Sequence, residues 1–275
     1  SAVDMIGELA LNRWPNTPLT DANVGENVRF GGVLDGAELV DAARFGVTVA
    51  EASAMDPQQR MLLESGYAAL HAGGLARSAL MGADTAVHIG LMNSDFADRP
   101  ASGSVYAATG ARPSVAAGRI SFVLGMQGPC TTIDTACSSA LAAVDFAQLH
   151  LLTAHASSAL AFAVNVILTP STSVSFARAG MLSHDGRCKT FDSRANGYVR
   201  AEGVGGLVLT AVPSGTGVAL ELASNVVRQD GLSASLTAPN GVAQSRLLGA
   251  AISEAALEPS ELKLIEPHGT GTPLG

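Results

Sequence analysis

Charged side chains are scarce in this chain. Asp, Glu, Lys and Arg make up 15% of the 275 residues, whereas apolar residues make up 47%. Ordinary globular domains carry about 25% charged residues. The shortage of charge implies that much of the chain lies in a large core or in interfaces.

Basic residues are also few, and they form no cluster. Lys and Arg total 16 against 24 Asp and Glu, which gives a net charge of −8. Because a nucleic-acid surface needs a basic stripe to bind phosphates, this balance argues against a general nucleic-acid-binding protein.

Cysteines and long apolar runs are missing as well. Three cysteines do not make a disulfide framework. The longest apolar run, residues 159–168, is interrupted by Asn165 and is shorter than the ~20 residues that a membrane-spanning helix needs. No basic stretch followed by an apolar one begins the chain, so no secretory signal is visible. We therefore expect a soluble protein without a membrane span.

Cys137 lies where a short β-rich run, residues 131–133, gives way to an apolar helix, residues 138–152. A helix that is apolar around most of its circumference is expected to be buried between layers. At its first turn, free amides and the positive dipole end favour the thiolate form of a cysteine. A free cysteine is more often a buried structural residue, but this placement favours a nucleophile, which requires a reducing compartment.

His268 follows the apolar run 262–265 and opens an alternation of glycine and threonine, Gly269-Thr-Gly-Thr272. This pattern is typical of a strand that ends in a loop where a ligand can approach the backbone closely. A histidine there could polarise a carbonyl or move a proton. Taken together with Cys137, it is a candidate catalytic residue. We expect the two to converge on one pocket, because each follows a strand that ends at the same edge of a layered fold.

Strands and helices are expected to alternate along the chain, which indicates a layered α/β architecture. The expected strands are residues 86–91, 131–133, 159–168, 206–211, 218–227 and 262–265. The expected helices lie within residues 1–21, at 57–72, from 113 onward, at 138–152 and at 244–256. Residues 213–217 form the clearest linker.

Other patterns fail to indicate a cofactor or metal. The glycines of residues 203–206 run into a strand, so they lack the context of a dinucleotide-binding turn, and no Lys-Ser/Thr completes a P-loop at residues 269–272. His184 and Cys188 have a metal-like spacing but no second pair, so no metal is expected. Two of the cysteines are interpreted as small core residues, and four of the histidines as surface or packing residues. They are Cys130 and Cys188, and His71, His88, His150 and His155.

Further motifs extend over essentially the whole chain. They are Gly31-Gly-Val-Leu-Asp35, Met55-Asp-Pro-Gln-Gln-Arg60, Ser114-Val-Ala-Ala-Gly-Arg-Ile-Ser121, Arg178-Ala-Gly-Met-Leu-Ser183, Asp185-Gly-Arg-Cys-Lys-Thr-Phe-Asp192, Gly197-Tyr-Val-Arg200, Gln229-Asp-Gly231 and Thr237-Ala-Pro-Asn-Gly241. With the Cys137 and His268 segments, their order and spacing resemble the β-ketoacyl synthase (ketosynthase) domain of polyketide synthases and of related enzymes of fatty acid biosynthesis.

The resemblance implies a thiolase-like α-β-α-β-α fold made of two similar halves. Residues 1–212 correspond to most of the first half, which carries the nucleophile, and residues 217–275 to the start of the second. Members of the family begin earlier. Their later acidic residue, lysine, second histidine and Gly-Phe-Gly-Gly gate are expected beyond Gly275. We expect a chain ending there to be inactive in condensation and poorly soluble alone.

The implied activity is acyl transfer followed by decarboxylative Claisen condensation with a malonyl-type thioester, through an acyl-Cys137 intermediate. By resemblance, His268 stabilises the enolate, and Thr270 and Thr272 bind the substrate's pantetheine amides. No cofactor is bound directly, because the substrates arrive on the phosphopantetheine arm of an acyl carrier protein. Arg112, Arg119 and Arg187 are scattered candidates for a basic patch facing that acidic partner.

A homodimer, or a dimer with a related ketosynthase chain, is implied through residues 128–134, with other polyketide synthase domains as further partners. The expected location is the cytoplasm or the interior of an organelle, with N-terminal targeting left open. Two alternatives stay open at this point. One is a catalytically incomplete ketosynthase-like subunit with a structural role in a larger assembly, and the other is a cysteine hydrolase of thioesters.

Overall fold

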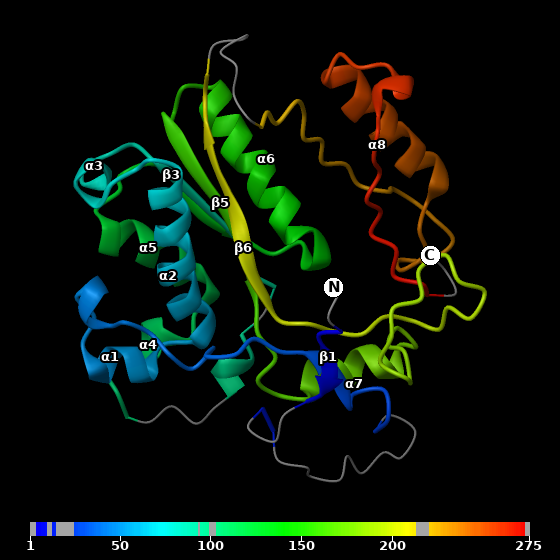
Figure 1. The fold of residues 1–275 in the computed structure, drawn as a ribbon, viewed down its shortest axis with the longest axis horizontal. Helices are drawn as coiled ribbons and strands as arrows, with labels where there is room; N and C mark the ends of the chain where they lie inside the picture. The colour runs from blue at the N-terminus through cyan, green and yellow to red at the C-terminus, as the bar shows by residue number, and fades with distance from the viewer. Residues whose placement is uncertain are drawn as a thin grey trace. The chain divides into compact units, whose positions relative to one another are not determined.

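The computed structural model describes residues 4–9, 13–14, 25–92, 94–98, 103–212 and 220–272. The chain forms two compact units (Figure 1). The sheet unit comprises Leu34–Val166 and Glu202–Ala219, and the loop unit comprises Ser1–Val33, Ile167–Ala201 and Leu220–Gly275. The division into thiolase-like halves between residues 212 and 217 stays a prediction.

The sheet unit is built on four strands in the order β4-β3-β5-β6. Strand β3 is parallel to β4 and β5, and β5 is antiparallel to β6. The strands are β3 (Ala86–Gly90), β4 (Cys130–Ile133), β5 (Ser158–Asn165) and β6 (Gly203–Thr210). The helices are α1 (Val49–Ala54), α2 (Pro57–Ala72), α3 (Arg77–Leu80), α4 (Ala107–Gly110), α5 (Ala116–Leu124) and α6 (Ser139–Leu152), and the 3₁₀ turns are Ala43–Phe45, Asp95–Asp98, Pro113–Val115 and Ala136–Ser138. The sequence predicted these four strands and the helices α2, α5 and α6.

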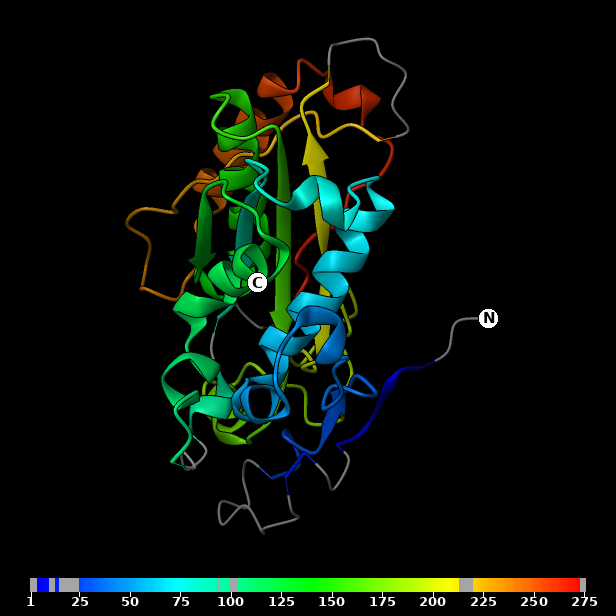
Figure 2. The same ribbon diagram turned by 90° about the vertical axis from the view of Figure 1, so that its left-hand side faces the viewer.

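Helices cover both faces of this sheet (Figures 1 and 2). One face packs against α6 through small side chains, among them Ala86, Ala147 and Ala159, which are fully buried. On the other face, Leu160 of β5 and Ile120 of α5 both lie against Gly66 of α2. Because successive side chains of a strand point to opposite faces, β3 and β5 are buried on both sides, and their almost uninterrupted apolar sequence follows from this.

Helix α2 has the bounds that the sequence predicted. The side chain of Asp56 caps its first turn by accepting a hydrogen bond from the Gln58 backbone at 2.8 Å, and Pro57 takes the first helical position. Leu62, Leu63 and Leu70 of this helix are fully buried. The cap, the proline and the apolar spacing are all local signals, so the prediction succeeds here.

The loop unit contains a small antiparallel sheet of β1 (Ile6–Glu8) and β2 (Phe30–Gly32), the helices α7 (Ser171–Arg178) and α8 (Gly241–Glu254), and a 3₁₀ turn at Pro259–Glu261. Val28 and Leu182 form a small core with Val174, Phe176 and Tyr198. The rest of its described residues follow turns and extended backbone.

Two predicted strands are absent from the described residues. Residues 220–230 and 262–272 adopt neither strand nor helix. Leu220 is 92% exposed and Leu264 is 85% exposed. A strand requires a neighbour that accepts and donates its backbone hydrogen bonds, and the structure shows no such ladder along these described segments. Apolar spacing alone therefore gave a wrong prediction.

The helix predicted within residues 1–21 is also wrong where the structure describes it, because residues 6–8 form β1 and pair with β2. The remainder of that segment is described only at residues 4–5, 9 and 13–14. The predicted linker at residues 213–217 lies outside the described residues.

Candidate functional site

Cys137 lies in a tight turn between a strand and a helix of the sheet unit. Strand β4 ends at Ile133, the 3₁₀ turn Ala136–Ser138 follows, and α6 begins at Ser139. Cys137 is exposed. The predicted strand–nucleophile–helix order is therefore present, with the cysteine two positions ahead of the α-helix, and its thiol is open to a substrate.

Hydrogen bonds close the turn around Cys137. The Ala136 N–H donates to Asp134 Oδ1 at 2.9 Å, and the Ser138 hydroxyl donates to the Thr135 carbonyl at 2.8 Å. The Ser139 hydroxyl donates to the Ala136 carbonyl at 2.7 Å and accepts from the Thr135 N–H at 2.9 Å. These bonds fix the backbone on the N-terminal side of the cysteine.

Ala136 itself has a left-handed backbone conformation, with φ of 56°. For a residue with a Cβ atom this conformation costs roughly 1–2 kcal/mol, and glycine is the residue that adopts it routinely. The composition of the turn, Thr-Ala-Cys-Ser-Ser, predicts tightness but not a left-handed alanine. This strained position is a feature that the sequence analysis missed.

The start of α6 lies directly on the end of β3. A Cβ atom added to Gly90 would lie 2.7 Å from both the carbonyl carbon and the carbonyl oxygen of Ser139. Atoms do not approach so closely, so only glycine permits this contact. Gly90 thereby sets the height of the helix above the sheet, and with it the position of the turn that carries Cys137.

The predicted burial of α6 between two layers is wrong in the described structure. Its inner face is buried and includes Ala143 and Ala147, whereas Leu141, Leu149 and Leu152 on the outer side are 64%, 51% and 76% exposed. The helix is apolar on both sides, but only the side that faces the sheet has a packing partner among the described residues.

The other two cysteines are exposed, so their interpretation as core residues is wrong. Cys130 begins β4, which is the edge strand of the described four-stranded sheet. Cys188 lies in a loop of the loop unit, where its sulfur accepts the Val199 N–H at 3.4 Å. Both positions depend on strand order and loop packing, which local composition does not determine.

His268 lies in an extended segment of the loop unit and is exposed, and no strand precedes it. The loop after it is anchored at both of its glycines. The Gly269 carbonyl accepts the Thr190 hydroxyl at 2.6 Å, and the Gly271 carbonyl accepts the Gly197 N–H at 3.0 Å. Thr270 and Thr272 are half-buried, with their hydroxyl oxygens 3.3 Å apart.

The segment that anchors this loop is itself a polar network. Lys189 Nζ is 2.6 Å from an oxygen of Asp185, and the Ser183 hydroxyl donates to the same carboxylate. Hydrogen bonds from Lys189 and Ser183 hold the pKa of Asp185 well below its usual range. His184, which has no role assigned from the sequence, contacts the Asn196 amide through Nδ1 at 2.8 Å. These bonds hold in place the segment whose residues Thr190 and Gly197 bind the His268 loop.

Cys137 thus belongs to the sheet unit, and His268, Thr270 and Thr272 share one loop of the loop unit. His268, Thr270 and Thr272 lie together because they are close in sequence and because Gly269 and Gly271 anchor their loop. The convergence of Cys137 and His268 in one pocket stays a prediction.

A pair of stacked histidines lies between β3 and α6. His88 of β3 is fully buried, with Nδ1 2.8 Å from the Thr131 hydroxyl and Nε2 2.9 Å from Nδ1 of His150. The two rings stack with their centroids 4.9 Å apart. Burial, followed by the charge of His150, lowers the pKa of His88 to about 4. The interpretation of both as packing residues agrees with this geometry, although the pairing itself is not visible in the sequence.

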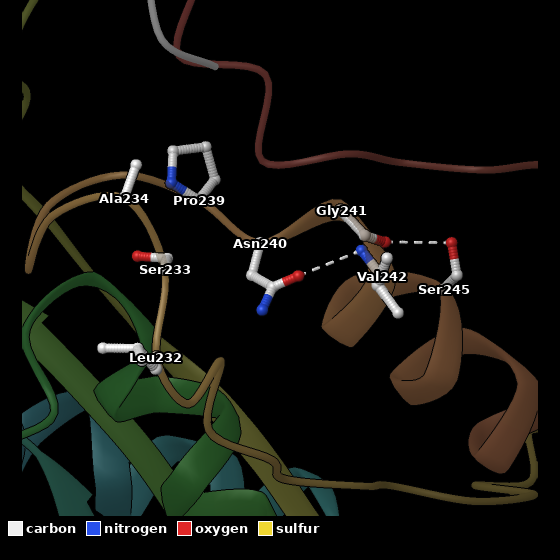
Figure 3. Close-up of a pocket in the computed structure, with 8 residues that line it drawn as sticks. All are labelled: Leu232, Ser233, Ala234, Pro239, Asn240, Gly241, Val242 and Ser245. Atoms are coloured by element: carbon white, nitrogen blue, oxygen red, sulfur yellow. Dashed lines mark hydrogen bonds between the residues drawn. The ribbon is translucent and has the colours of Figure 1, made fainter.

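A hollow of about 540 Å³ lies at the start of α8 (Figure 3). It is lined by Leu232, Ser233, Ala234, Pro239, Asn240, Gly241, Val242 and Ser245. The Asn240 side chain accepts hydrogen bonds from the N–H groups of Val242 and Ala243, both at 3.2 Å. Two amides of this helix end are already engaged by Asn240, and none of the candidate catalytic residues lines the hollow.

Over the described ranges, no group of three or more His, Cys, Asp and Glu side chains is arranged to hold a metal ion. None of the helices that the structure describes has the length and apolar character required to cross a membrane.

Comparison with protein families gives two matches along the chain. The family described as beta-ketoacyl synthase, N-terminal domain, matches residues 1–213, and the beta-ketoacyl synthase C-terminal domain matches residues 220–275. Among curated proteins, the phenolphthiocerol synthesis polyketide synthase type I Pks15/1 of Mycobacterium bovis is 41% identical over 94% of this chain, which covers 12% of that protein. The spectinabilin polyketide synthase system protein NorA' of Streptomyces orinoci is 41% identical over 97% of the chain, which covers 8% of that protein.

Solved structures agree with these matches. The oxazolomycin ketosynthase domain OzmH KS7 of Streptomyces albus JA3453 superposes with a TM-score of 0.88 at 31% identity, covering 98% of this chain and 49% of the other. A ketosynthase from module 6 of the bacillaene synthase of Bacillus subtilis 168 gives a TM-score of 0.85 at 32% identity, with coverage of 97% and 46%. The chain therefore spans about half the length of these structures, and the predicted thiolase-like fold class is confirmed.

Proposed function

Because the chain belongs to the β-ketoacyl synthase family, as a ketosynthase of the polyketide synthase type, we propose that it catalyses carbon–carbon bond formation by decarboxylative Claisen condensation. The observation that carries the proposal is the exposed Cys137 in a hydrogen-bonded turn at the start of α6. Such a turn presents a thiol to a substrate while the helix stays packed on the sheet.

In the first step, the Cys137 thiolate attacks the carbonyl carbon of an acyl thioester carried on a phosphopantetheine arm. The carbon–sulfur bond to pantetheine breaks, the pantetheine thiolate leaves and takes up a proton, and acyl-Cys137 remains. Covalent catalysis of this kind divides one difficult reaction into two easier ones. The exposure of Cys137 supports this role.

In the second step, a malonyl-type thioester loses CO2 and becomes an enolate. The enolate carbon attacks the acyl-Cys137 carbonyl, and the Cys137 thiolate leaves. His268 donates a hydrogen bond to the thioester oxygen on which negative charge develops, since donors aimed at that position stabilise the transition state most. Its exposed position on an anchored loop supports this assignment.

Thr270 and Thr272 bind the amide groups of the pantetheine arm through their hydroxyls. Their half-buried positions beside the anchored glycines support this role, because the hydroxyls are held in place and stay accessible. The protein itself then needs no bound cofactor, and an acyl carrier protein is its substrate-bearing partner.

A second copy of the chain, or a related ketosynthase, is the proposed partner along β4. This strand lies at the edge of the described sheet, and its residues are exposed or half-buried. Open edges promote pairing with another strand. Sedimentation of the full-length protein at micromolar concentration tests this partner: a stable monomer would contradict it.

The test of the activity uses the full-length protein with acyl-loaded and malonyl-loaded carrier proteins. We expect the acyl group on Cys137 in the wild type and in His268→Ala, and no adduct in Cys137→Ala. Condensation should fall by roughly 10²–10³ in His268→Ala, as is typical when a preorganised donor is lost. Cys188→Ser is the matched control, because it removes an exposed thiol outside the turn.

Each alternative has its own result in this assay. Acyl-Cys137 that is released by water without a new carbon–carbon bond would indicate a thioester hydrolase. A folded protein that never becomes acylated would indicate a structural subunit. Condensation by Cys137→Ala at the wild-type rate would refute the proposed nucleophile.

The shared pocket of Cys137 and His268 is tested by a crosslink. Dibromoacetone alkylates two nucleophiles that lie within a few bond lengths of each other, so it should join these two residues in one peptide pair identified by mass spectrometry. Alkylation of Cys137 without any His268 crosslink would contradict the shared pocket.

A further inference from the structure

The turn that carries Cys137 depends on a residue in a rare conformation. Ala136 precedes the thiol-bearing residue and has φ of 56°. The left-handed region suits glycine, which has no Cβ atom, and is unfavourable for alanine. Such a conformation persists where neighbouring groups hold it in place, so the atoms bonded to the Ala136 peptide groups determine whether the turn keeps its shape.

One of those neighbours is a buried side chain. The Ser139 hydroxyl donates to the Ala136 carbonyl at 2.7 Å and accepts from the Thr135 N–H at 2.9 Å. Ser139 is 5% exposed, so water competes little for these bonds. Two further hydrogen bonds restrain Ala136. Its carbonyl also accepts the backbone N–H of Ser139, and its own N–H donates to the exposed carboxylate of Asp134. Of the two side chains that bind Ala136, the serine is the better protected from water.

Ser139 is itself held in place by its contact with Gly90 of β3. Its carbonyl group lies so close to Gly90 that a Cβ atom there would be 2.7 Å away. The backbone that carries the hydroxyl thus lies against the end of β3, which is fully buried. The sheet therefore restrains Cys137 through two residues. Strand β3 supports Ser139, and the Ser139 hydroxyl binds Ala136, which precedes the cysteine.

The geometry points to Ser139 as a positioning residue for Cys137. Its hydroxyl holds Ala136 in the left-handed conformation, and this conformation directs the Cys137 thiol toward the substrate. Without the hydroxyl, Ala136 relaxes toward negative φ and rotates the peptide that precedes the cysteine. The inference rests on the proposed function only in taking Cys137 as the nucleophile.

The test is a double-mutant cycle between positions 139 and 136. The measured quantity is the rate of iodoacetamide alkylation of Cys137 in the full-length protein, followed by peptide mapping. We expect Ser139→Ala to slow alkylation about three- to tenfold, the effect of losing the neutral hydrogen bond to the Ala136 carbonyl. In the Ala136→Gly background, where the left-handed turn carries no penalty, the same change should slow it less than about twofold.

Ser138→Ala is the matched control. The Ser138 hydroxyl makes its hydrogen bonds within the same turn to Thr135, so its loss should change the rate less than about twofold. Equal slowing by Ser139→Ala in both backgrounds, or no slowing in either, would overturn the inference, because a general structural role predicts no rescue by glycine.

Circular dichroism and thermal unfolding of the same samples report whether the variants are folded. If Ser139→Ala does not fold, the comparison of Ala136→Gly with Ala136→Val decides. Glycine should keep the alkylation rate within about twofold, whereas the β-branched valine, which tolerates positive φ poorly, should lower it. Equal rates for the two variants would overturn the inference.

Alkylation requires no acyl substrate, so the two hypotheses fail separately. Rescue by glycine together with a Cys137 that becomes acylated but supports no condensation would refute the proposed function and leave the positioning role intact. If condensation depends on Cys137 but positions 136 and 139 show no coupling, the proposed function stands and the positioning role of Ser139 is refuted.

Discussion

Protonation of His88 should destabilise the sheet unit in mildly acidic solution. The His88 ring is fully buried, contacts His150 at 2.9 Å, and has its pKa lowered from 6.5 to about 4 by burial and then by the charge of His150. The unfolded chain takes up a proton near the ordinary value of 6.5, and the folded chain takes it up only near 4. Stability is therefore complete above about pH 6.5 and is lost as the pH falls toward 4.

The size of the effect follows from the shift. One pKa unit corresponds to about 1.4 kcal/mol, so His88 should remove about 2 kcal/mol of stability between pH 7.5 and pH 5, and about 3 kcal/mol by pH 4. These are large fractions of a domain's usual stability of about 5–15 kcal/mol. A loss of about 2 kcal/mol lowers the protection of core amides from exchange about thirtyfold.

Other ionisable side chains lie near His88 or have shifted pKa values. The His150 ring stacks on the His88 ring, and the ring centroid of His155 lies 6.1 Å from that of His150. Burial raises the pKa of Asp56 above its ordinary value of 3.8. As the pH falls toward 3.8, the folded chain therefore takes up a proton at Asp56 before the unfolded chain does. This proton uptake stabilises the fold and opposes the loss of stability caused by His88. The pKa of Asp185 is lowered, and its contribution is lost below 3.8, outside the window.

The assay is hydrogen–deuterium exchange of the β3 and α6 peptides between pH 7.5 and pH 5, corrected for the pH dependence of intrinsic exchange. His88→Phe keeps an aromatic ring at this position and removes the titrating group, so its protection should depend much less on pH. His71→Phe changes an exposed histidine of α2 and is the matched control. If the wild type and His88→Phe lose protection equally, the reasoning is wrong.

Three further predictions concern the sheet unit. Limiting iodoacetamide should label Cys137 ahead of the other two exposed thiols, and peptide mapping that shows either of them labelled first would argue against the nucleophile. Gly110→Ala should lower the free energy of unfolding by about 1–3 kcal/mol, because a Cβ there would lie 1.8 Å from the last carbonyl oxygen of α1. Gly118→Ala, with nothing within 4 Å of its added Cβ, should instead raise it by about 0.5–1 kcal/mol, and denaturation curves in which both change in the same direction would contradict the packing. Glu51→Gln should cost roughly 1.5–3 kcal/mol, since Arg119 is 7% exposed and its guanidinium lies 2.5 Å from that carboxylate; an unchanged denaturation midpoint would show that the ion pair contributes nothing.

Local signals in the sequence determined much of the sheet unit. Asp56 and Pro57 mark the start of α2, and apolar runs without glycine or proline mark β5 and α6. The position of Cys137 between β4 and α6 was also predictable, because the end of a strand and the start of a helix both leave local patterns. The family resemblance carried the fold class and the chemistry, which composition alone does not reach.

Only the tertiary structure decided which apolar segments find partners. Residues 220–227 and 262–265 have strand-like sequences but no strand ladder in the described structure, and α6 is covered on one face alone. Hydrogen-bonding neighbours and packing partners come from distant parts of a chain, so a local pattern does not specify them. The left-handed Ala136, the contact of Gly90 with Ser139 and the stacking of His88 on His150 have the same origin. Each arises where two segments distant in sequence, or two ends of one tight turn, are forced into contact by the packing of α6 on the sheet.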